Sequence, residues 1–158
     1  MRPDAVHRVL ETEVAAARTR RGGEAPRVLD VGGGSGGWAV PLAALGCQLT
    51  VIEPSPNALA TLYRRAADAG VSGQITAIQG DVDALERLVP DAAADLVLGH
   101  GLLEIVDDVD VAVAALTKAA APGGALSIVV ANRYAAVLRR ALAGRPAEAL
   151  SLRRADRG

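Results

Sequence analysis

The feature that most constrains this chain is a run of glycines that directly follows a short apolar segment. Residues 27–31 read RVLDV, the next positions read GGGSGG, and residues 38–45 have the pattern of a helix. Glycine allows positive φ angles and close approach of the backbone to a ligand. Free N–H groups at the start of a helix can hold an anionic group. The segment therefore predicts a strand, a ligand-binding turn and a helix.

Strand and helix patterns alternate along the rest of the chain. Further strands are expected at residues 48–53, 74–81, 94–100 and 125–132, and helices at 4–18, 38–45, 54–70, 83–89, 108–121 and 134–142. Pro122-Gly123-Gly124 is expected to stop the helix before the last strand. Short apolar strands that alternate with helices indicate parallel βαβ units. We expect one domain over residues 1–158, a doubly wound α/β fold with a parallel sheet covered on both faces.

Chemistry in such a sheet is expected beyond the carboxyl ends of the strands. After the glycine run, the next positions of this kind are Glu53 with Pro54, residues 80–83 and residues 99–103. Glu53 can accept both hydroxyl hydrogens of a ribose. Asp81 can accept a hydrogen bond from an adenine amino group, with Val82 offering a backbone N–H, but an Asp there is equally a favoured helix N-cap. The glycine run also satisfies the dinucleotide pattern, which leaves an NAD-binding domain open.

The order and spacing of five segments resemble the class I S-adenosylmethionine-dependent methyltransferases. The segments are VLDVGGGSGG, VIEPSP, IQGDV, ADLVLGHGLLEIVDD and LTKAAAPGGALSIVVANRYA. NAD-binding domains usually carry an apolar residue in place of Asp30 and lack the Pro-Gly-Gly turn, so the set favours a methyltransferase over an oxidoreductase. His100 with LLEIVDD, and SIVVANRYAAVLRRALAG, resemble more narrowly the bacterial tRNA 5-carboxymethoxyuridine methyltransferase group, which esterifies a modified wobble uridine.

This resemblance implies S-adenosylmethionine as the cofactor and assigns residues to it. The glycine run would lie against the methionine part, Glu53 at the ribose, Asp81 and Val82 at the adenine, and His100 near the methyl donor. The residues assigned to the cofactor are Asp30, Gly32, Gly33, Gly34, Ser35, Gly36, Glu53, Pro54, Asp81, Val82 and His100. Arg2 is a candidate for an arginine that contacts the cofactor carboxylate, although its spacing differs by several residues. No residue is assigned to a metal site.

His100 is also the candidate catalytic residue. A methyl group on a sulfonium is already activated, so the protein mainly orients and desolvates the reactants. A carboxylate acceptor is ionised at neutral pH and needs no general base. A neutral acceptor needs a proton acceptor, and His100 has a suitable ordinary pKa. The alternative is a histidine at a strand end that is satisfied by a backbone carbonyl.

The charge of the chain is unevenly distributed. Residues 28–131 carry twelve acidic and four basic side chains, whereas residues 132–158 carry seven basic and two acidic ones. The basic end is either a solvated helix face or an edge that binds a polyanion such as tRNA. No apolar run reaches the ~20 residues of a membrane helix, and the N-terminus has no secretory pattern. With Cys47 as the one cysteine, we expect a cytoplasmic protein without a membrane partner.

The sequence departs from the family after Gly144. Members of the family continue with two further strands, whereas this chain stops at Gly158 after an Arg-rich tail. We therefore expect the sheet to lack the terminal antiparallel hairpin, which leaves the fifth strand as an edge through which a homodimer could form. A domain that binds the cofactor without turnover is the alternative to an active enzyme.

Overall fold

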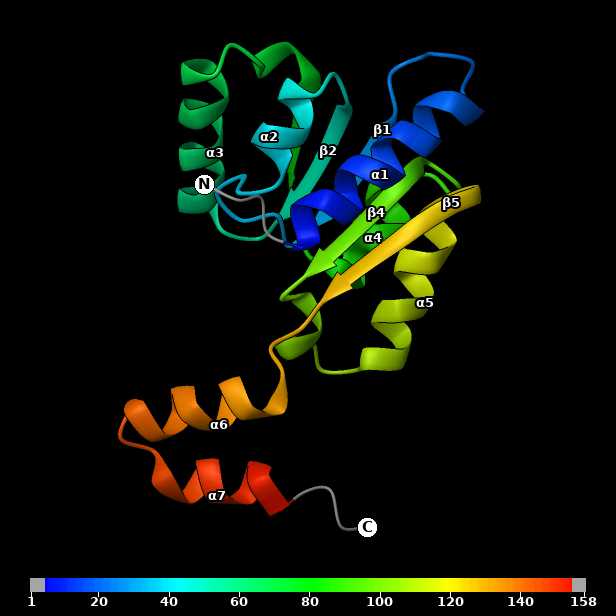
Figure 1. The fold of residues 1–158 in the computed structure, drawn as a ribbon. Helices are drawn as coiled ribbons and strands as arrows, with labels where there is room; N and C mark the ends of the chain where they lie inside the picture. The colour runs from blue at the N-terminus through cyan, green and yellow to red at the C-terminus, as the bar shows by residue number, and fades with distance from the viewer. Residues whose placement is uncertain (1–4, 155–158) are drawn as a thin grey trace.

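The computed structural model describes residues 5–154, apart from several side chains of the last two helices. Five strands alternate with helices along the chain (Figure 1). The strands are β1 (Arg27–Val31), β2 (Gln48–Glu53), β3 (Ile75–Gln79), β4 (Ala94–His100) and β5 (Ala120–Val129). The helices are α1 (Ala5–Arg20), α2 (Ala39–Ala44), α3 (Pro56–Asp68), α4 (Leu85–Leu88), α5 (Val109–Ala119), α6 (Arg133–Leu142) and α7 (Pro146–Arg154), with short 3-10 turns η1 (Ser72–Gln74), η2 (Val82–Ala84) and η3 (Leu102–Glu104).

The sheet has the strand order β3-β2-β1-β4-β5, and every neighbouring pair is parallel. The chain moves outward from β1 in one direction through β2 and β3, and then crosses back to β4 on the other side of β1. This reversal beside β1 defines the edge at which open α/β sheets bind ligands. The predicted doubly wound parallel sheet is confirmed.

Helices cover both faces of the sheet. Neighbouring residues of a strand point to opposite faces, so each strand contributes apolar side chains to both. Val28 belongs to a buried cluster with residues of α1, α2 and α3. Leu29, the next residue, belongs to a second cluster with residues of α4 and α5. The sheet is thus the middle of three layers, and its strands are apolar on both faces.

Local signals set where two of the covering helices begin. The Ser55 hydroxyl accepts a hydrogen bond from the Ala58 N–H, and Pro56 occupies the first turn of α3. Asp108 accepts a hydrogen bond from the Val111 N–H at the start of α5. Such side chains satisfy N–H groups that have no partner within a helix. They therefore mark the residues at which α3 and α5 begin.

The predicted start of the last strand is wrong by five residues. We expected the strand at 125–132, but β5 begins at Ala120 and runs through the Pro-Gly-Gly sequence. Ala120 pairs with Ala94 and Ala125 pairs with Leu96, so the residues between them form an irregular excursion. Gly123 adopts a φ of 74°, which a glycine reaches without strain. Pro-Gly-Gly therefore bends an existing strand here instead of separating a helix from one.

The Arg-rich tail contains a helix that the sequence analysis did not predict. Residues 146–154 form α7, which packs against α6. The turn between them uses Gly144 at a φ of 74°, and Glu148 accepts from the Arg145 side chain at 2.8 Å. Figure 1 shows α6 and α7 as a hairpin that extends from the carboxyl end of β5 away from the sheet. We call this pair of helices the basic arm.

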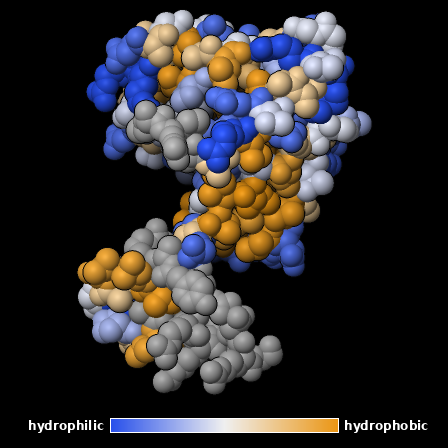
Figure 2. All heavy atoms as spheres, viewed as in Figure 1, coloured by the Kyte–Doolittle hydropathy of each residue, from blue (hydrophilic) through white to orange (hydrophobic). Residues whose placement is uncertain are grey.

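The outer edge of β5 adjoins exposed apolar side chains. Ile128 and Val130 are 38% and 51% exposed, and Val109 and Val111 of α5 are also exposed. Figure 2 shows an apolar surface where β5 and α5 lie. The homodimer expected at this edge, and the single domain over residues 1–158, both stay predictions. None of the helices in residues 5–154 combines the length and hydrophobicity needed to cross a membrane.

Candidate functional site

A cavity of about 320 Å³ opens at the carboxyl ends of β1, β2, β3 and β4. Its volume lies within the range typical of small-molecule sites. The cavity is lined by Gly32, Glu53, Pro54, Asp81, Val82, Asp83, His100, Gly101, Leu102, Ile105, Val106 and Asp107. Every lining residue is the last of a strand or lies in the segment that follows one, as the strand-order rule requires.

Six of the predicted site residues line this cavity, and the others lie in or behind the glycine loop. Gly32, Glu53, Pro54, Asp81, Val82 and His100 form part of the wall. Asp30, Gly33, Gly34, Ser35 and Gly36 are not in the wall. Sequence reasoning missed Ile105, Val106 and Asp107, which follow η3. The exposure of Ile105, at 77%, cannot be read from an apolar run such as LLEIV.

The Glu53 carboxylate joins the glycine loop to the end of β2. Its Oε2 accepts a hydrogen bond from the Gly34 N–H at 2.9 Å, and its Oε1 accepts one from the Ser55 N–H at 2.9 Å. Glu53 is 8% exposed, so these bonds form largely out of water. Each oxygen of an ionised carboxylate can accept a second hydrogen bond. Glu53 can therefore hold the loop and still accept hydroxyl groups from a ligand in the cavity.

Behind the loop, Gly33 occupies a position with no room for a side chain. A Cβ at Gly33 would lie 2.7 Å from Asp30 Oδ2 and 2.7 Å from Val51 Cγ1. Both neighbours belong to strands, so they are held by the sheet. Gly33 is therefore required for the tight return of the backbone over Asp30.

Asp30 is a buried carboxyl group with an unusual environment. It is 2% exposed, and its Oδ2 has no hydrogen-bond partner among the described residues. Burial, together with the nearby charge of Glu53, raises the pKa of Asp30 to about 7. A buried carboxyl group resists ionisation when water is excluded and a like charge lies close by. Perturbed groups of this kind concentrate at functional sites.

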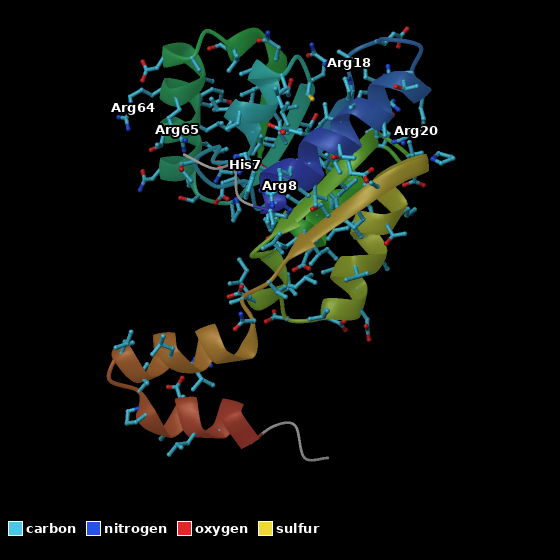
Figure 3. The ribbon with its side chains drawn as sticks, viewed as in Figure 1. His7, Arg8, Arg18, Arg20, Arg64 and Arg65 are labelled. Atoms are coloured by element: carbon cyan, nitrogen blue, oxygen red, sulfur yellow. The ribbon has the colours of Figure 1, made fainter. Side chains whose placement is uncertain are left out.

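Ser35 points to the outer side of the loop. Its carbonyl oxygen accepts from Arg65 Nη1 at 3.1 Å, and its hydroxyl accepts from the same nitrogen at 3.4 Å. Figure 3 places Arg65 on α3, while His7 and Arg8 lie at the start of α1. Arg65 thus connects the glycine loop to the helix beside it. The other arginine considered for the cofactor, Arg2, lies outside the described residues.

His100 ends β4 and forms one wall of the cavity. Its Nε2 lies 2.9 Å from the Ser127 hydroxyl, and its ring packs edge-on against Trp38 at a centroid distance of 5.0 Å. Burial lowers the pKa of His100, which favours the neutral imidazole. The buried Nδ1 has no partner among the described residues. The ring is therefore held by a side chain, not by the backbone carbonyl of the alternative interpretation.

Asp81 is both a helix N-cap and a residue of the cavity wall, the two roles that the sequence left open. Its Oδ1 accepts a hydrogen bond from the Ala84 N–H at 3.2 Å, which makes it the N-cap of η2. The same residue lines the cavity. Since Oδ1 serves the cap, the second carboxylate oxygen stays available to a ligand.

These residues fit an adenosine cofactor such as S-adenosylmethionine. A buried carboxylate beside a glycine loop suits a ribose, and the next strand end supplies an acidic side chain and a backbone N–H for a base. Two buried atoms behind this site, His100 Nδ1 and Asp30 Oδ2, have no hydrogen-bond partner among the described residues. Within residues 5–154, no group of three or more His, Cys, Asp or Glu side chains is arranged to hold a metal ion.

Comparison with known families identifies the chain. Residues 28–124, which contain the glycine loop and the ends of β1 to β4, match the family described as a methyltransferase domain. The chain belongs to this methyltransferase family. The strand order of the sheet is that of the class I methyltransferase fold.

Curated relatives of this methyltransferase differ in their acceptors. The chain is 36% identical over 111 residues to a ubiquinone biosynthesis O-methyltransferase of Methylocella silvestris, covering 70% of this chain and 41% of the relative. It is 31% identical over 119 residues to the tRNA 5-carboxymethoxyuridine methyltransferase of Escherichia coli, covering 75% of this chain and 45% of that protein. The chain spans about half the length of the curated relatives that it matches.

A solved relative supports the same assignment. A methyltransferase from Geobacter sulfurreducens, solved in complex with S-adenosyl-L-homocysteine, superposes with a TM-score of 0.59 at 30% identity. The match covers 75% of this chain and 47% of that one. The comparisons give no support to the NAD-binding alternative.

The first prediction concerns the space behind the loop. Gly33→Ala should lower the free energy of unfolding by about 1–3 kcal/mol, because the new methyl group meets Asp30 and Val51. Urea unfolding of the purified chain measures this loss. Gly37→Ala is the matched control, since a Cβ at Gly37 meets nothing within 4 Å and its φ is not positive. Equal losses in both variants would contradict the role of Gly33.

The second prediction concerns pH. The pKa of Asp30 is about 7 in the folded chain and near 3.8 in the unfolded one. Over that interval the folded state keeps a proton that the unfolded state has lost, so the Asp30 contribution to stability falls as pH rises. Asp30→Asn removes this contribution. The wild type should therefore lose stability relative to Asp30→Asn from about pH 4 to about pH 7, as measured by urea unfolding of both; a constant difference would refute the raised pKa.

Proposed function

We propose that this chain binds S-adenosylmethionine in the cavity at the carboxyl ends of its strands and transfers the methyl group to an acceptor. The observation that carries the proposal is the Glu53 carboxylate, buried in the cavity wall beside a glycine loop whose backbone it holds. Membership of the methyltransferase family and the S-adenosyl-L-homocysteine complex of a structural relative support it. When bound, the cofactor supplies a methyl group on a positively charged sulfur.

The remaining wall residues suit the parts of this cofactor. Glu53 would accept the two ribose hydroxyls through its unused lone pairs, and Asp81 with Val82 would bind the adenine. The glycine loop, with Asp30 behind it, would face the methionine part. His100 lines the cavity and would lie near the methyl donor, with its ring held by Ser127 and Trp38.

The third prediction tests the ribose contact. Glu53→Gln should weaken binding of both S-adenosylmethionine and S-adenosylhomocysteine about 10-fold, because a charged acceptor of hydrogen bonds is replaced by a neutral one. Isothermal titration calorimetry measures both constants. Glu86→Gln is the control, since Glu86 is exposed on α4 and pairs with Lys118 away from the cavity. Unchanged affinity in Glu53→Gln would refute the ribose contact.

Trp38 offers an independent test of the cofactor class. It is the one tryptophan of the chain, and it packs against His100 in the cavity wall. S-Adenosylhomocysteine should change its fluorescence, whereas NADH should not.

Turnover is a separate question, since the cofactor site could be complete while the acceptor site is not. Binding without methyl transfer to any acceptor would favour the cofactor-binding module.

We further propose an RNA acceptor, specifically a carboxylate on a modified tRNA wobble uridine. The basic arm begins where β5 ends, on the side of the sheet that carries the cavity, and it projects outward (Figure 1). Its sequence carries the excess of arginines, which can neutralise phosphates. The similarity to the Escherichia coli tRNA methyltransferase also supports this acceptor. A carboxylate acceptor is already ionised, so His100 would position it and no proton would need to move.

The fourth prediction follows from the arm. Replacing Arg139, Arg140, Arg153 and Arg154 with alanine should weaken tRNA binding and reduce the slope of log affinity against log salt by about 3. The side chains of Arg139, Arg153 and Arg154 lie outside the part of the chain that the structure describes. The Nε atom of Arg140 lies 3.6 Å from Oε2 of Glu148. Filter binding over a salt series measures the slope. Arg64→Ala on α3 is the control (Figure 3), and salt-independent tRNA binding would refute the proposal.

The cellular setting is also proposed. A reducing compartment such as the cytoplasm suits a chain whose one cysteine, Cys47, is buried and unpaired.

A further inference from the structure

We infer that Ser127 is a positioning residue for the methyl transfer, because its hydroxyl keeps the His100 ring in one neutral form with neither ring nitrogen offered to the cavity. His100 then takes no proton from the acceptor. The inference rests on the proposed function and deepens it, since it states which class of acceptor the site can use. That class is an acceptor whose nucleophilic atom is already ionised.

The register of the sheet brings Ser127 next to His100. Ser127 of β5 pairs with Leu98 of β4, and His100 follows Leu98 by two residues. Side chains two residues apart on a strand point to the same face, and Leu98 belongs to the buried cluster that contains residues of α1, α2 and α3. His100 and Ser127 therefore meet on this face, where Nε2 of His100 lies 2.9 Å from the Ser127 hydroxyl.

The two ring nitrogens of His100 have different surroundings. Nε2 faces the Ser127 hydroxyl, which can accept or donate a hydrogen bond. Nδ1 is buried and has no hydrogen-bond partner among the described residues. Proteins leave a buried N–H group without a partner more rarely than a buried acceptor. The proton of the neutral ring therefore belongs on Nε2, which donates it to Ser127 Oγ.

A second proton on the ring is disfavoured by the same surroundings. It would place a positive charge and an unpartnered N–H group out of contact with water. Burial accordingly lowers the pKa of His100. The titratable groups that share the cavity wall with the ring, or pack on the tryptophan beside it, are Glu53, Asp81, Asp83, Asp107 and His7. Nearby carboxylates raise the pKa of an imidazole, so burial outweighs them here.

His100 held in this way lacks the geometry of a general base. A general base presents an unprotonated atom within hydrogen-bond reach of the acceptor. Nε2 carries a proton and is directed at Ser127, and Nδ1 is buried, so the cavity does not reach it. The ring also packs edge-on against Trp38 at a centroid distance of 5.0 Å, which limits its rotation. His100 therefore contributes the shape of the wall and not a site for a proton.

An acceptor that enters the site as an anion needs no such base. A carboxylate is ionised at neutral pH. One of its oxygen lone pairs forms the new O–C bond, the electron pair of the broken C–S bond stays on sulfur, and no proton moves. A neutral hydroxyl acceptor would have to lose a proton, and His100 could not take it. The geometry at His100 thus favours carboxylates over neutral hydroxyl groups.

The test reads the His100 ring directly by long-range ¹H–¹⁵N NMR of the purified chain, without and with S-adenosylhomocysteine. The chain has two histidines, so the His100 signals are those lost in His100→Gln. The wild type should carry the ring proton on Nε2 and take up a second proton only below the ordinary pKa of 6.5. A proton on Nδ1, or titration at or above this pKa with the ligand bound, would overturn the inference.

Ser127→Ala separates the role of the hydroxyl from simple packing. Without the acceptor for Nε2–H, both neutral forms of the ring should be populated, and the shifts of the two nitrogens should move towards each other. Ser127→Thr keeps the hydroxyl and should restore the wild-type spectrum. Ser72→Ala is the matched control, since Ser72 is exposed on η1 and outside the cavity.

Two further outcomes separate this inference from the proposed function. A His100 spectrum that is the same in Ser127→Ala as in the wild type would overturn the role of Ser127 and leave the cofactor site intact. A wild type that shows the expected ring form but binds no S-adenosylhomocysteine in calorimetry would instead refute the proposed function.

Discussion

The hydrogen bonds of the Glu53 carboxylate hold the site together. One oxygen holds the Gly34 N–H and the other holds the Ser55 N–H, so the loop after β1 and the turn after β2 share one acceptor. The charge of Glu53 contributes to the raised pKa of the buried Asp30 carboxyl group. Two acidic groups therefore lie beneath one loop. The loop can keep this shape because Gly33, which has no side chain, leaves room for Asp30. The position of the loop therefore depends on both Gly33 and Glu53.

The chain separates its charges in space. The cavity wall is acidic, whereas the basic arm leaves the sheet just beyond the end of β5. A cationic cofactor and the proposed polyanionic acceptor would require surfaces of opposite sign, because a single surface could not favour both. The division seen here would let each partner meet the charge that attracts it. We propose that the inner carboxylates bind the cofactor and that the outer arginines bind a nucleic acid.

Much of the fold could be predicted because its signals are local. Apolar strands, helix caps such as Ser55 and the glycine run each act through neighbouring residues, and the parallel sheet follows from their alternation. The start of β5 could not be predicted, since Pro-Gly-Gly normally ends a helix. Here it lies within the strand, because Ala120, which precedes it, already pairs with Ala94 of β4. The helix at residues 146–154 was also missed, because its contacts with α6 lie outside its own sequence.

The sequence by itself determined the class of the fold, the position of the glycine loop and the acidic residue at the end of β2. These depend on backbone freedom and on residues close to one another in the chain. Only the tertiary structure decided that Ile105, Val106 and Asp107 join the cavity wall, that Ser127 holds His100, and that Asp30 is buried against a like charge. Each of these depends on segments distant in sequence, and burial changes the energy of a charge in ways that no local pattern records.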